Sequence, residues 1–353
     1  MPSSGDAEFA TQAAPAALEV DYVTRERLES EPETWWRQVL GVVGFARPPG
    51  PTRTPSATTM TPLLGGVEER CEVWRVGGAE CRESLISARR GGVHYRFGEN
   101  LLFGSLHIED TGAAESGAAA LFDAAQAAYE DLFEVLDATQ YRHLIRVWNY
   151  VPEINGTVAG EERYRLFNSA RRTAFLESGR AVIGSSVPAA CALGVPAGAP
   201  MCIYFLAARR PTKTIENPRQ TSAYYYPPKF GKDSPIFSRA CIFGDAQHGH
   251  LFISGTASIV GCETMHAGDA QAQTCETLAN INALLDEANR ICGSKRYAMD
   301  SLKFKVYVRH VADLERIQAV LTKEVPGCTP LYLHADICRQ DLVVEIEATG
   351  QAR

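Results

Sequence analysis

The segment from His334 to Gly350, HADICRQDLVVEIEATG, combines a thiol with carboxyl groups in a largely apolar setting. Its second part, Leu342–Glu347, is apolar and rich in β-branched residues, which predicts a half-buried strand. Burial on such a strand raises the pKa of a carboxyl group, so Glu345 could hold a proton near neutral pH and act as a general acid. The alternative is that Glu345 faces solvent and Cys338 is a small core residue, the usual role of a free cysteine.

The same segment is predicted to fold as a hairpin of two short strands. A two-residue turn at Gln340–Asp341 would pair Cys338 with Val343, and the same register would pair Asp336 with Glu345. Side chains alternate with period two along a strand, so these four would share one face. The pattern therefore predicts a thiol and a carboxyl group side by side on an apolar hairpin.

The whole chain has 353 residues, enough for two domains or for one domain with an internal duplication. It carries 35 Lys and Arg against 42 Asp and Glu, a formal net charge of −7. No run of basic residues forms a nucleic-acid-binding surface, and the overall field repels anions. An anionic ligand would therefore need arginines gathered locally at its site.

Further features favour a cytoplasmic protein without a metal. The N-terminal residues lack the basic and apolar regions of a secretory signal, and no apolar stretch approaches the ~18–20 residues that span a bilayer. The ten cysteines contain no CxxC pair, which fits reduced thiols rather than disulfides. Cys262–His266 and His248–His250 contain metal-ligand residue types without a second matching pair, so we expect no metal site.

The pattern of the first half predicts regular elements after an irregular start. Residues 1–18 are expected to be disordered, and the Pro/Thr-rich stretch Ala46–Pro62 is expected to be a surface loop. Hydrophobic periodicity then predicts a helix, a strand, a second helix and a pair of strands, over Gly117–Gln140, His143–Val151, Glu161–Gly179, Ser185–Val195 and Pro200–Arg209.

The second half repeats this order. It predicts a helix, a strand, a helix and the hairpin, over Asp269–Cys292, Leu302–Val311, Ala312–Glu324 and His334–Gly350. We therefore expect an α+β fold made of two copies of one unit, each a mixed sheet with two helices packed on one face. The alternative is a chance agreement of generic α+β segments.

Between the halves lies a segment rich in tyrosine and proline, Arg210–Pro235. Segments with this much aromatic surface fold over a neighbour and often line a pocket, although this one could merely pack. We expect four parts: a disordered start (1–18), an N-terminal domain (19–209), a connecting segment that lines the site (210–235) and a C-terminal catalytic domain (236–353).

The C-terminal half resembles the RidA (YjgF-like) proteins, whose fold is chorismate mutase-like. The resemblance rests on four stretches, Leu251–Ser258, Gly268–Ala288, Lys305–Leu314 and Val343–Ala348. Small trimeric enzymes of that family hydrolyse reactive imines and hold the substrate carboxylate with an arginine just before the penultimate strand. No arginine lies between Cys328 and Cys338 here, which argues against an imine deaminase.

From about residue 40 onward, the chain resembles the chorismatases, a family built on that fold. The matching motifs occur in order at Arg146–Asn155, Glu162–Phe167, Glu216–Pro227, Phe237–Ala240, Ser254–Gly261 and His334–Glu347. The resemblance implies a cofactor-free enzyme that hydrolyses or rearranges chorismate and releases pyruvate. The other product would be a hydroxybenzoate or a dihydroxycyclohexadienoate.

Chorismate breakdown requires a proton on the terminal methylene carbon of the enolpyruvyl ether. Carbon is a slow base, so the reaction needs a well-placed general acid that keeps its proton near neutral pH. Glu345 has the right setting between Val344 and Ile346, and the resemblance places the family's proton donor there. Glu347, on the same face of the strand, is the alternative acid.

Two further residues bear on the product. In relatives that form 3-hydroxybenzoate through an arene-oxide-like intermediate, a cysteine stands at the position of Cys338 and a glycine at that of Gly255. Cys338 could act as nucleophile or proton relay if neighbours lower its pKa, whereas Gly255 could instead mark a bulge or a close strand contact. Tyr225 and Cys262 depart from the family pattern, so 4-hydroxybenzoate and the dihydrodiol remain alternatives to 3-hydroxybenzoate.

The two carboxylates of chorismate need donors, which arginine supplies best. Candidates within the matching motifs are Arg163, Arg219 and Arg309, with Tyr150, Tyr224 and Tyr226 as hydroxyl donors and ring walls. Each could instead be structural. A RidA-type imine deaminase and a non-catalytic metabolite-binding protein are the rival functions, and monomer and homotrimer are both compatible with a duplicated chain. We expect no nucleic-acid or membrane partner.

Overall fold

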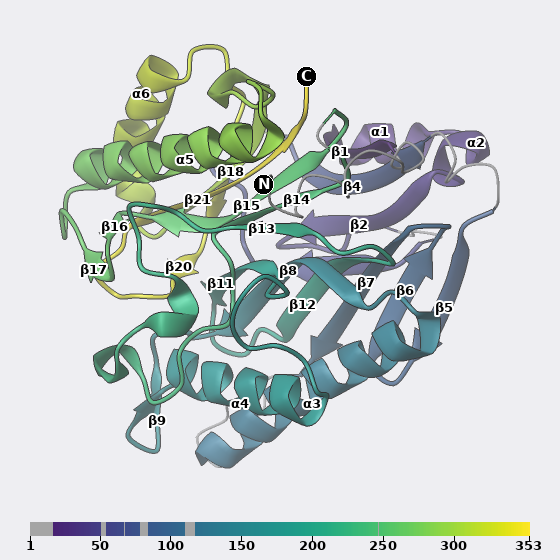
Figure 1. The fold of residues 1–353 in the computed structure, drawn as a ribbon, viewed down its shortest axis with the longest axis horizontal. Helices are drawn as coiled ribbons and strands as arrows, with labels where there is room; N and C mark the ends of the chain where they lie inside the picture. The colour runs from purple at the N-terminus through teal and green to yellow at the C-terminus, as the bar shows by residue number, and fades with distance from the viewer. Residues whose placement is uncertain (1–16, 51–53, 67, 78–83, 110–116, 246) are drawn as a thin grey trace, which may run out of the picture.

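The computed structural model describes residues 17–50, 54–66, 68–77, 84–109, 117–245 and 247–353. Three large sheets organise these residues, and helices lie on their outer faces (Figure 1). Most of the expected disordered start lies outside the described residues, since only 17 and 18 of that range are described. Both belong to the first strand, β1.

One unit is a seven-stranded sheet covered on one face by two helices. Its strands in spatial order are β20 (Asp336–Ile337), β11 (Ala189–Val195), β8 (His143–Pro152), β12 (Met201–Ala208), β7 (Leu101–Ile108), β6 (Val93–Phe97) and β5 (Ile86–Arg90). The helices are α3 (Gly117–Thr139) and α4 (Arg163–Glu177). The apolar stripe of α3 packs with α4 on this sheet and forms one hydrophobic core.

The second unit repeats this plan with a six-stranded sheet. Its strands in spatial order are β13 (Lys213–Ile215), β14 (Ala240–Phe243), β15 (His250–Ala257), β21 (Val344–Gln351), β18 (Leu302–Val308) and β19 (Leu331–His334). The helices α5 (Ala270–Cys292) and α6 (Leu314–Glu324) enclose a second core. Asp269 caps α5 by accepting from the amide of Ala272. The expected α+β fold of two similar units is confirmed.

A third, four-stranded sheet stands at the N-terminal side. Its strands in spatial order are β1 (Ala17–Thr24), β4 (Arg70–Gly77), β2 (Val39–Phe45) and β3 (Ser56–Thr59), with short helices α1 (Arg25–Ser30) and α2 (Glu33–Trp36). The prediction of a surface loop over Ala46–Pro62 is wrong at Ser56–Thr59, which form the strand β3. Ala57 and Thr59 are fully buried there, because small side chains fit close beneath the neighbouring sheet.

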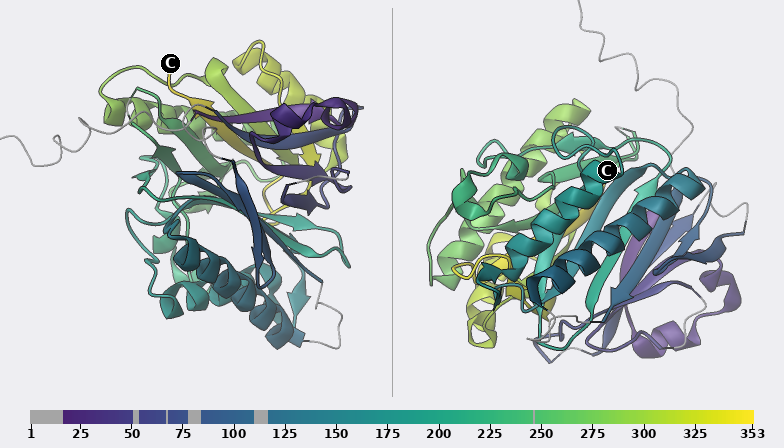
Figure 2. Two further views of the ribbon diagram at one scale, coloured as in Figure 1. Left: turned by 90° about the vertical axis from the view of Figure 1, so that its right-hand side faces the viewer. Right: turned by 90° about the horizontal axis from the view of Figure 1, so that it is seen from below.

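The inner faces of the three sheets share one central core. Trp74 of β4 packs against Trp148 of β8 and Phe252 of β15, with ring centroids 5.5 and 6.1 Å apart. Trp148 stacks on Tyr204 of β12 at 4.4 Å. The two helix pairs lie on opposite outer sides of this arrangement, as Figures 1 and 2 show. We call the space between the three sheets the central layer.

The strand pairings differ from the expected ones in two places. Ser185–Val195 and Pro200–Arg209 contain β11 and β12, which are not partners, because β8 lies between them and runs parallel to β11. The expected hairpin of His334–Gly350 is also wrong. β20 pairs with β11, whereas β21 lies between β15 and β18. Each half of the segment therefore joins a different sheet.

Short elements complete the fold. They are the two-stranded pairs β9 (Thr157–Val158) with β10 (Glu161–Glu162) and β16 (Ile259–Val260) with β17 (Glu263–Thr264), and the 3-10 turns Ala223–Tyr225, Pro228–Phe230, Met299–Ser301 and Val311–Asp313.

Candidate active site

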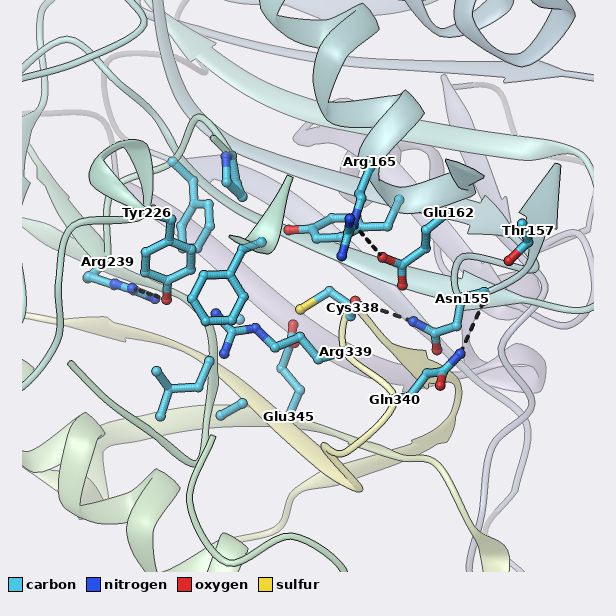
Figure 3. A pocket seen from close by; sticks show the side chains of 17 residues that line it. Asn155, Thr157, Glu162, Arg165, Tyr226, Arg239, Cys338, Arg339, Gln340 and Glu345 are labelled. Atoms are coloured by element: carbon cyan, nitrogen blue, oxygen red, sulfur yellow. Dashed lines mark hydrogen bonds and ion pairs between the residues drawn. The ribbon is translucent and has the colours of Figure 1, made fainter. Parts of the chain in front are cut away.

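A cavity of about 360 Å³ lies between the two α+β units, within the size range of small-molecule sites. Figure 3 shows Cys338, Arg339 and Glu345 in its middle, between Tyr226 and Arg239 on one side and Asn155 and Glu162 on the other. Arg165, Phe230, Pro235, Phe237 and Gly255 also line it. Both units and the connecting segment 210–235 thus contribute to the wall.

The alternation of β21 explains how Glu345 reaches this cavity. Val344 and Ile346 point into the core beneath α5 and α6, so Glu345 and Glu347 face the central layer. Glu345 is only 4% exposed, and its strand neighbours are Ala257 of β15 and Tyr307 of β18. Burial, together with the charge of Glu347, raises the pKa of Glu345 to about 8. The carboxyl group is therefore largely protonated at neutral pH.

Glu347 is in the opposite state although it is equally buried. Its carboxylate contacts Arg146 Nη2 at 2.5 Å and Lys305 Nζ at 2.6 Å, and it accepts from Trp148 Nε1 at 2.9 Å. Burial alone would raise its pKa, but Lys305 and Arg146 outweigh burial and lower it. An ionised, ion-paired carboxylate is no proton donor, so the geometry favours Glu345 over Glu347 as the acid.

Gly255 leaves the space that the Glu345 carboxyl occupies. A Cβ built on Gly255 would lie 1.9 Å from Glu345 Oε1, far inside van der Waals contact. The ladder between β15 and β21 shifts register between Ile253 and Thr256, so Gly255 also sits in a bulge. The close strand contact considered as the alternative role of Gly255 is therefore present, and it is this contact that lets the Glu345 carboxyl group lie against Gly255 in the cavity wall.

Cys338 lies in the cavity wall as a thiol. Burial and the Glu345 carboxyl raise its pKa to about 12, although Arg339 and Arg309 act in the opposite direction. The condition set for a nucleophilic Cys338, a lowered pKa, is not met. Its position near Glu345 does not come from a hairpin, since Cys338 follows β20 of the seven-stranded sheet and Glu345 lies on β21 of the six-stranded sheet.

Arg309, expected to hold substrate, lies outside the cavity wall and is fully engaged. Its guanidinium donates to Asp336 Oδ1 at 2.6 Å, to Asn155 Oδ1 at 3.0 Å and to three carbonyl groups, those of Ile337, Arg339 and Leu342. It therefore fixes the loop that carries Cys338 and Arg339.

The other two arginines expected from the sequence also have structural partners away from the cavity wall. Arg163 is buried, and its Nε donates to the carbonyl of Pro152 at 2.7 Å. Arg219 binds Asn280 Oδ1 at 2.6 Å and Glu276 Oε1 at 2.5 Å. Arg163 ties the start of α4 to the end of β8, and Arg219 ties the connecting segment to α5.

Of the three expected tyrosines, Tyr226 alone lines the cavity. Its hydroxyl accepts from Arg239 Nη2 at 2.7 Å. Tyr150 lies fully buried in the central layer, with its hydroxyl 3.0 Å from that of Tyr307. Tyr224 stacks edge-on against Tyr225, which is 63% exposed.

Three arginines that the sequence analysis did not single out line the cavity: Arg165, Arg239 and Arg339. The sequence analysis could have named each of them, because Arg165 lies in the matching motif ERYRLF, Arg239 lies in the motif FSRA and Arg339 directly follows Cys338. Arg339 stacks on Phe230, with its guanidinium carbon 4.1 Å from the ring centroid, and its buried Nη2 has no hydrogen-bond partner. Sequence spacing alone does not show which arginine of a motif turns inward.

The charge of the wall suits an anion. Arg165 Nε lies 3.3 Å from Glu162 Oε2. Arg239 and Arg339 form hydrogen bonds with carbonyl and hydroxyl oxygens but no ion pair with a carboxylate among the described residues. Glu345 is largely uncharged, so the wall is locally positive in a chain of net charge −7. The described residues contain no group of three or more potential metal ligands and no helix that could cross a membrane.

Comparisons with known proteins identify the family. Residues 72–207 match the model of the "Chorismatase FkbO/Hyg5-like, N-terminal" family. A chorismatase from Streptomyces rapamycinicus is 35% identical over 79% of this chain and 82% of its own length. A 3-hydroxybenzoate synthase from Streptomyces hygroscopicus is 33% identical over 88% of this chain and 91% of its own length. The chain belongs to the chorismatase family.

The crystal structure of a chorismatase also has this fold. It superimposes with a TM-score of 0.82 at 29% identity and covers 96% of this chain and all of that one. The family model spans β4 to most of β12 and so includes Arg165 on the cavity wall. The remaining wall of this chorismatase comes from the segment 210–235 and the C-terminal unit.

Proposed function

We propose that this chorismatase converts chorismate and releases pyruvate, with Glu345 as the general acid. The observation that carries the proposal is a buried, protonated carboxyl group in a cavity whose free charges are arginines. The name of one relative, chorismatase, supports chorismate as the substrate, and that of another, 3-hydroxybenzoate synthase, supports 3-hydroxybenzoate as a product.

The acid step follows from the state of Glu345. Its proton passes to the terminal methylene carbon of the enolpyruvyl ether, which creates an oxocarbenium ion at the ether carbon. Transfer to carbon is slow, so the donor must hold its proton at working pH and lie against the substrate. The pKa of about 8 supports the first requirement, and the place of Glu345 in the cavity wall supports the second.

The two carboxylates of chorismate are assigned to the cavity arginines. Arg239 and Arg339 both contact the ring of Tyr226, and Arg339 also contacts the ring of Phe230. A substrate ring in the cavity would therefore meet both aromatic surface and positive charge. Arg165, which is paired with Glu162, is a third cation in the wall. Arg309, Arg163 and Arg219 support this arrangement without touching substrate.

We propose 3-hydroxybenzoate as the main product. Chorismate has the combined atoms of 3-hydroxybenzoate and pyruvate, so this route consumes no water, whereas water capture of the cation would give a dihydroxycyclohexadienoate. Cys338 is assigned the steering of the arene-oxide-like intermediate from its place in the cavity wall, as a thiol that keeps its proton. 4-Hydroxybenzoate is the alternative if Tyr225 and Cys262 redirect the intermediate.

The test is to incubate the purified protein with chorismate, separate the products by chromatography and assay pyruvate in parallel. Equal amounts of pyruvate and 3-hydroxybenzoate are expected. Pyruvate with another ring product would overturn the product assignment and keep the substrate. No pyruvate would overturn the proposed function.

A further inference from the structure

The central layer holds buried charges that the proposed reaction does not use. Glu72 of β4, Arg146 of β8, Lys305 of β18 and Glu347 of β21 are each less than 5% exposed. Lys305 Nζ lies 2.7 Å from Glu72 Oε2 and 2.6 Å from Glu347 Oε1, and Arg146 binds the other oxygen of Glu347 at 2.5 Å. These four residues form a buried charge cluster that joins all three sheets.

The register of the strands brings this cluster to the catalytic acid. Glu347 pairs with Lys305 across the ladder of β21 and β18, and Glu345 pairs with Tyr307 in the same ladder. Because alternate residues share a face, Glu347 is the next side chain along β21 on the face that carries Glu345. The cluster therefore ends beside the acid.

The cluster is balanced only because Glu72 is present. Two cations, Arg146 and Lys305, face two anions, Glu347 and Glu72. Without Glu72 the cluster would carry one net positive charge, which favours the ionised form of any nearby carboxyl group. Glu72 Oε1 accepts from Trp74 Nε1 at 2.7 Å and from the Tyr204 hydroxyl at 3.2 Å, so the position of its carboxyl group is fixed.

Among the described residues, the other groups around Glu345 supply no unpaired negative charge that could substitute for that of Glu72. Burial raises the pKa of the surrounding thiols and phenols, so they are uncharged at neutral pH: Cys191 on β11, Cys338, Tyr150 on β8, Tyr164 on α4 and Tyr307 on β18. Arg146 of the cluster favours the ionised form of Glu345, as do Arg239 in the cavity wall and Arg309 beside the loop that carries Cys338. Arg339 and the Glu162–Arg165 pair share the cavity wall, and Arg171 on α4 lines a small chamber that also touches Glu345.

We propose that Glu72 is a positioning residue of the N-terminal sheet. Its negative charge, in contact with Lys305, balances the cations of the central layer, so that these cations do not stabilise the ionised form of Glu345. The N-terminal sheet thereby belongs to the catalytic machinery although none of its residues lines the described cavity wall. The catalytic use of the Glu345 proton rests on the proposed function, but the charge balance itself does not.

The test titrates Glu345 directly, in the absence of chorismate. The infrared carbonyl band of a protonated carboxyl group is followed with pH and assigned by its loss in Glu345→Gln. Glu72→Gln is expected to move the titration down by about one pH unit, because a negative charge is lost, and Lys305→Met to move it up by a similar amount, because a positive charge is lost. Glu69→Gln is the matched control, since it removes the same charge at an exposed position just before β4 and should move nothing.

Opposite shifts in the two variants are the signature of charge balance. Water entering a loosened core would lower the pKa of Glu345 in both variants, so two downward shifts, or no shift, would overturn the proposal. If Glu72→Gln alone fails to fold, the double variant Glu72→Gln/Lys305→Met replaces it. Removing one charge of each sign keeps the cluster balanced, so its Glu345 should titrate below that of Lys305→Met, and an equal titration would overturn the proposal. Because no substrate is present, the outcome stands apart from whether the protein turns over chorismate.

Discussion

At the scale of single residues, the site depends on two buried glutamates in opposite protonation states. Glu345 keeps its proton because it is buried and no cation among the described residues forms an ion pair with it, whereas Lys305 and Arg146 stabilise the ionised form of Glu347. Sequence alone gives both residues the same apolar strand and the same face. The difference comes from partners on β8 and β18, which are distant in the chain.

The pH dependence of turnover follows from the protonated state. Activity requires the acid form, so kcat/KM should be constant below the pKa of Glu345 and fall as pH rises through about 8. The fall in kcat should occur at a higher pH than the fall in kcat/KM, because a bound dianion disfavours the ionisation of Glu345 further. A steady-state profile from pH 6 to 10 measures both. Activity that rises through pH 8 would contradict the assignment.

The same raised pKa carries a cost in stability. The pKa of Glu345 is higher in the folded than in the unfolded state, so its burial destabilises the fold increasingly as pH rises from about 4.5 to about 8. Glu345→Gln should therefore raise the free energy of unfolding by roughly 2–4 kcal/mol at pH 8, and by less at pH 5. Urea unfolding at the two pH values measures the difference, and an equal effect at both would refute it.

At the scale of elements, the long periodic segments could be predicted and the pairings could not. The helices α3 and α5 begin and end within one residue of their predicted bounds, because caps and apolar stripes are local signals. The placement of β20 and β21 in different sheets depends on contacts between distant residues. Likewise Arg309 and Arg339 both lie just beyond the end of a strand, and only their partners show that Arg309 holds the loop whereas Arg339 lines the cavity.

Arg309 is predicted to act on the loop rather than on the substrate. Arg309→Met removes five hydrogen bonds and should destabilise the protein by about 3 kcal/mol, since several acceptors lose a charged donor. It should also lower kcat/KM through the displaced Cys338 loop. The control is Arg316→Met, because Arg316 is exposed and its contact with Asp313 is long at 3.5 Å. Equal unfolding curves for the two variants would refute this role.

At the scale of the whole molecule, one core joins three sheets, so the units should unfold together. Trp74 of the N-terminal sheet contacts rings of both other sheets. Trp74→Ala should cost about 3–5 kcal/mol and lower the stability of every unit. Urea transitions followed by near-ultraviolet and far-ultraviolet circular dichroism should coincide before and after the change. A separate early transition in the variant would show that the N-terminal sheet unfolds alone.

The central claim is that Glu345 donates the proton that starts chorismate breakdown. The most direct measurement compares wild type with Glu345→Gln for chorismate turnover, with chorismate binding measured by calorimetry. The account predicts a loss of about a hundredfold to ten-thousandfold in kcat with binding retained, because the amide keeps the shape of the side chain and has no acidic proton. Near-normal turnover in Glu345→Gln would contradict the account.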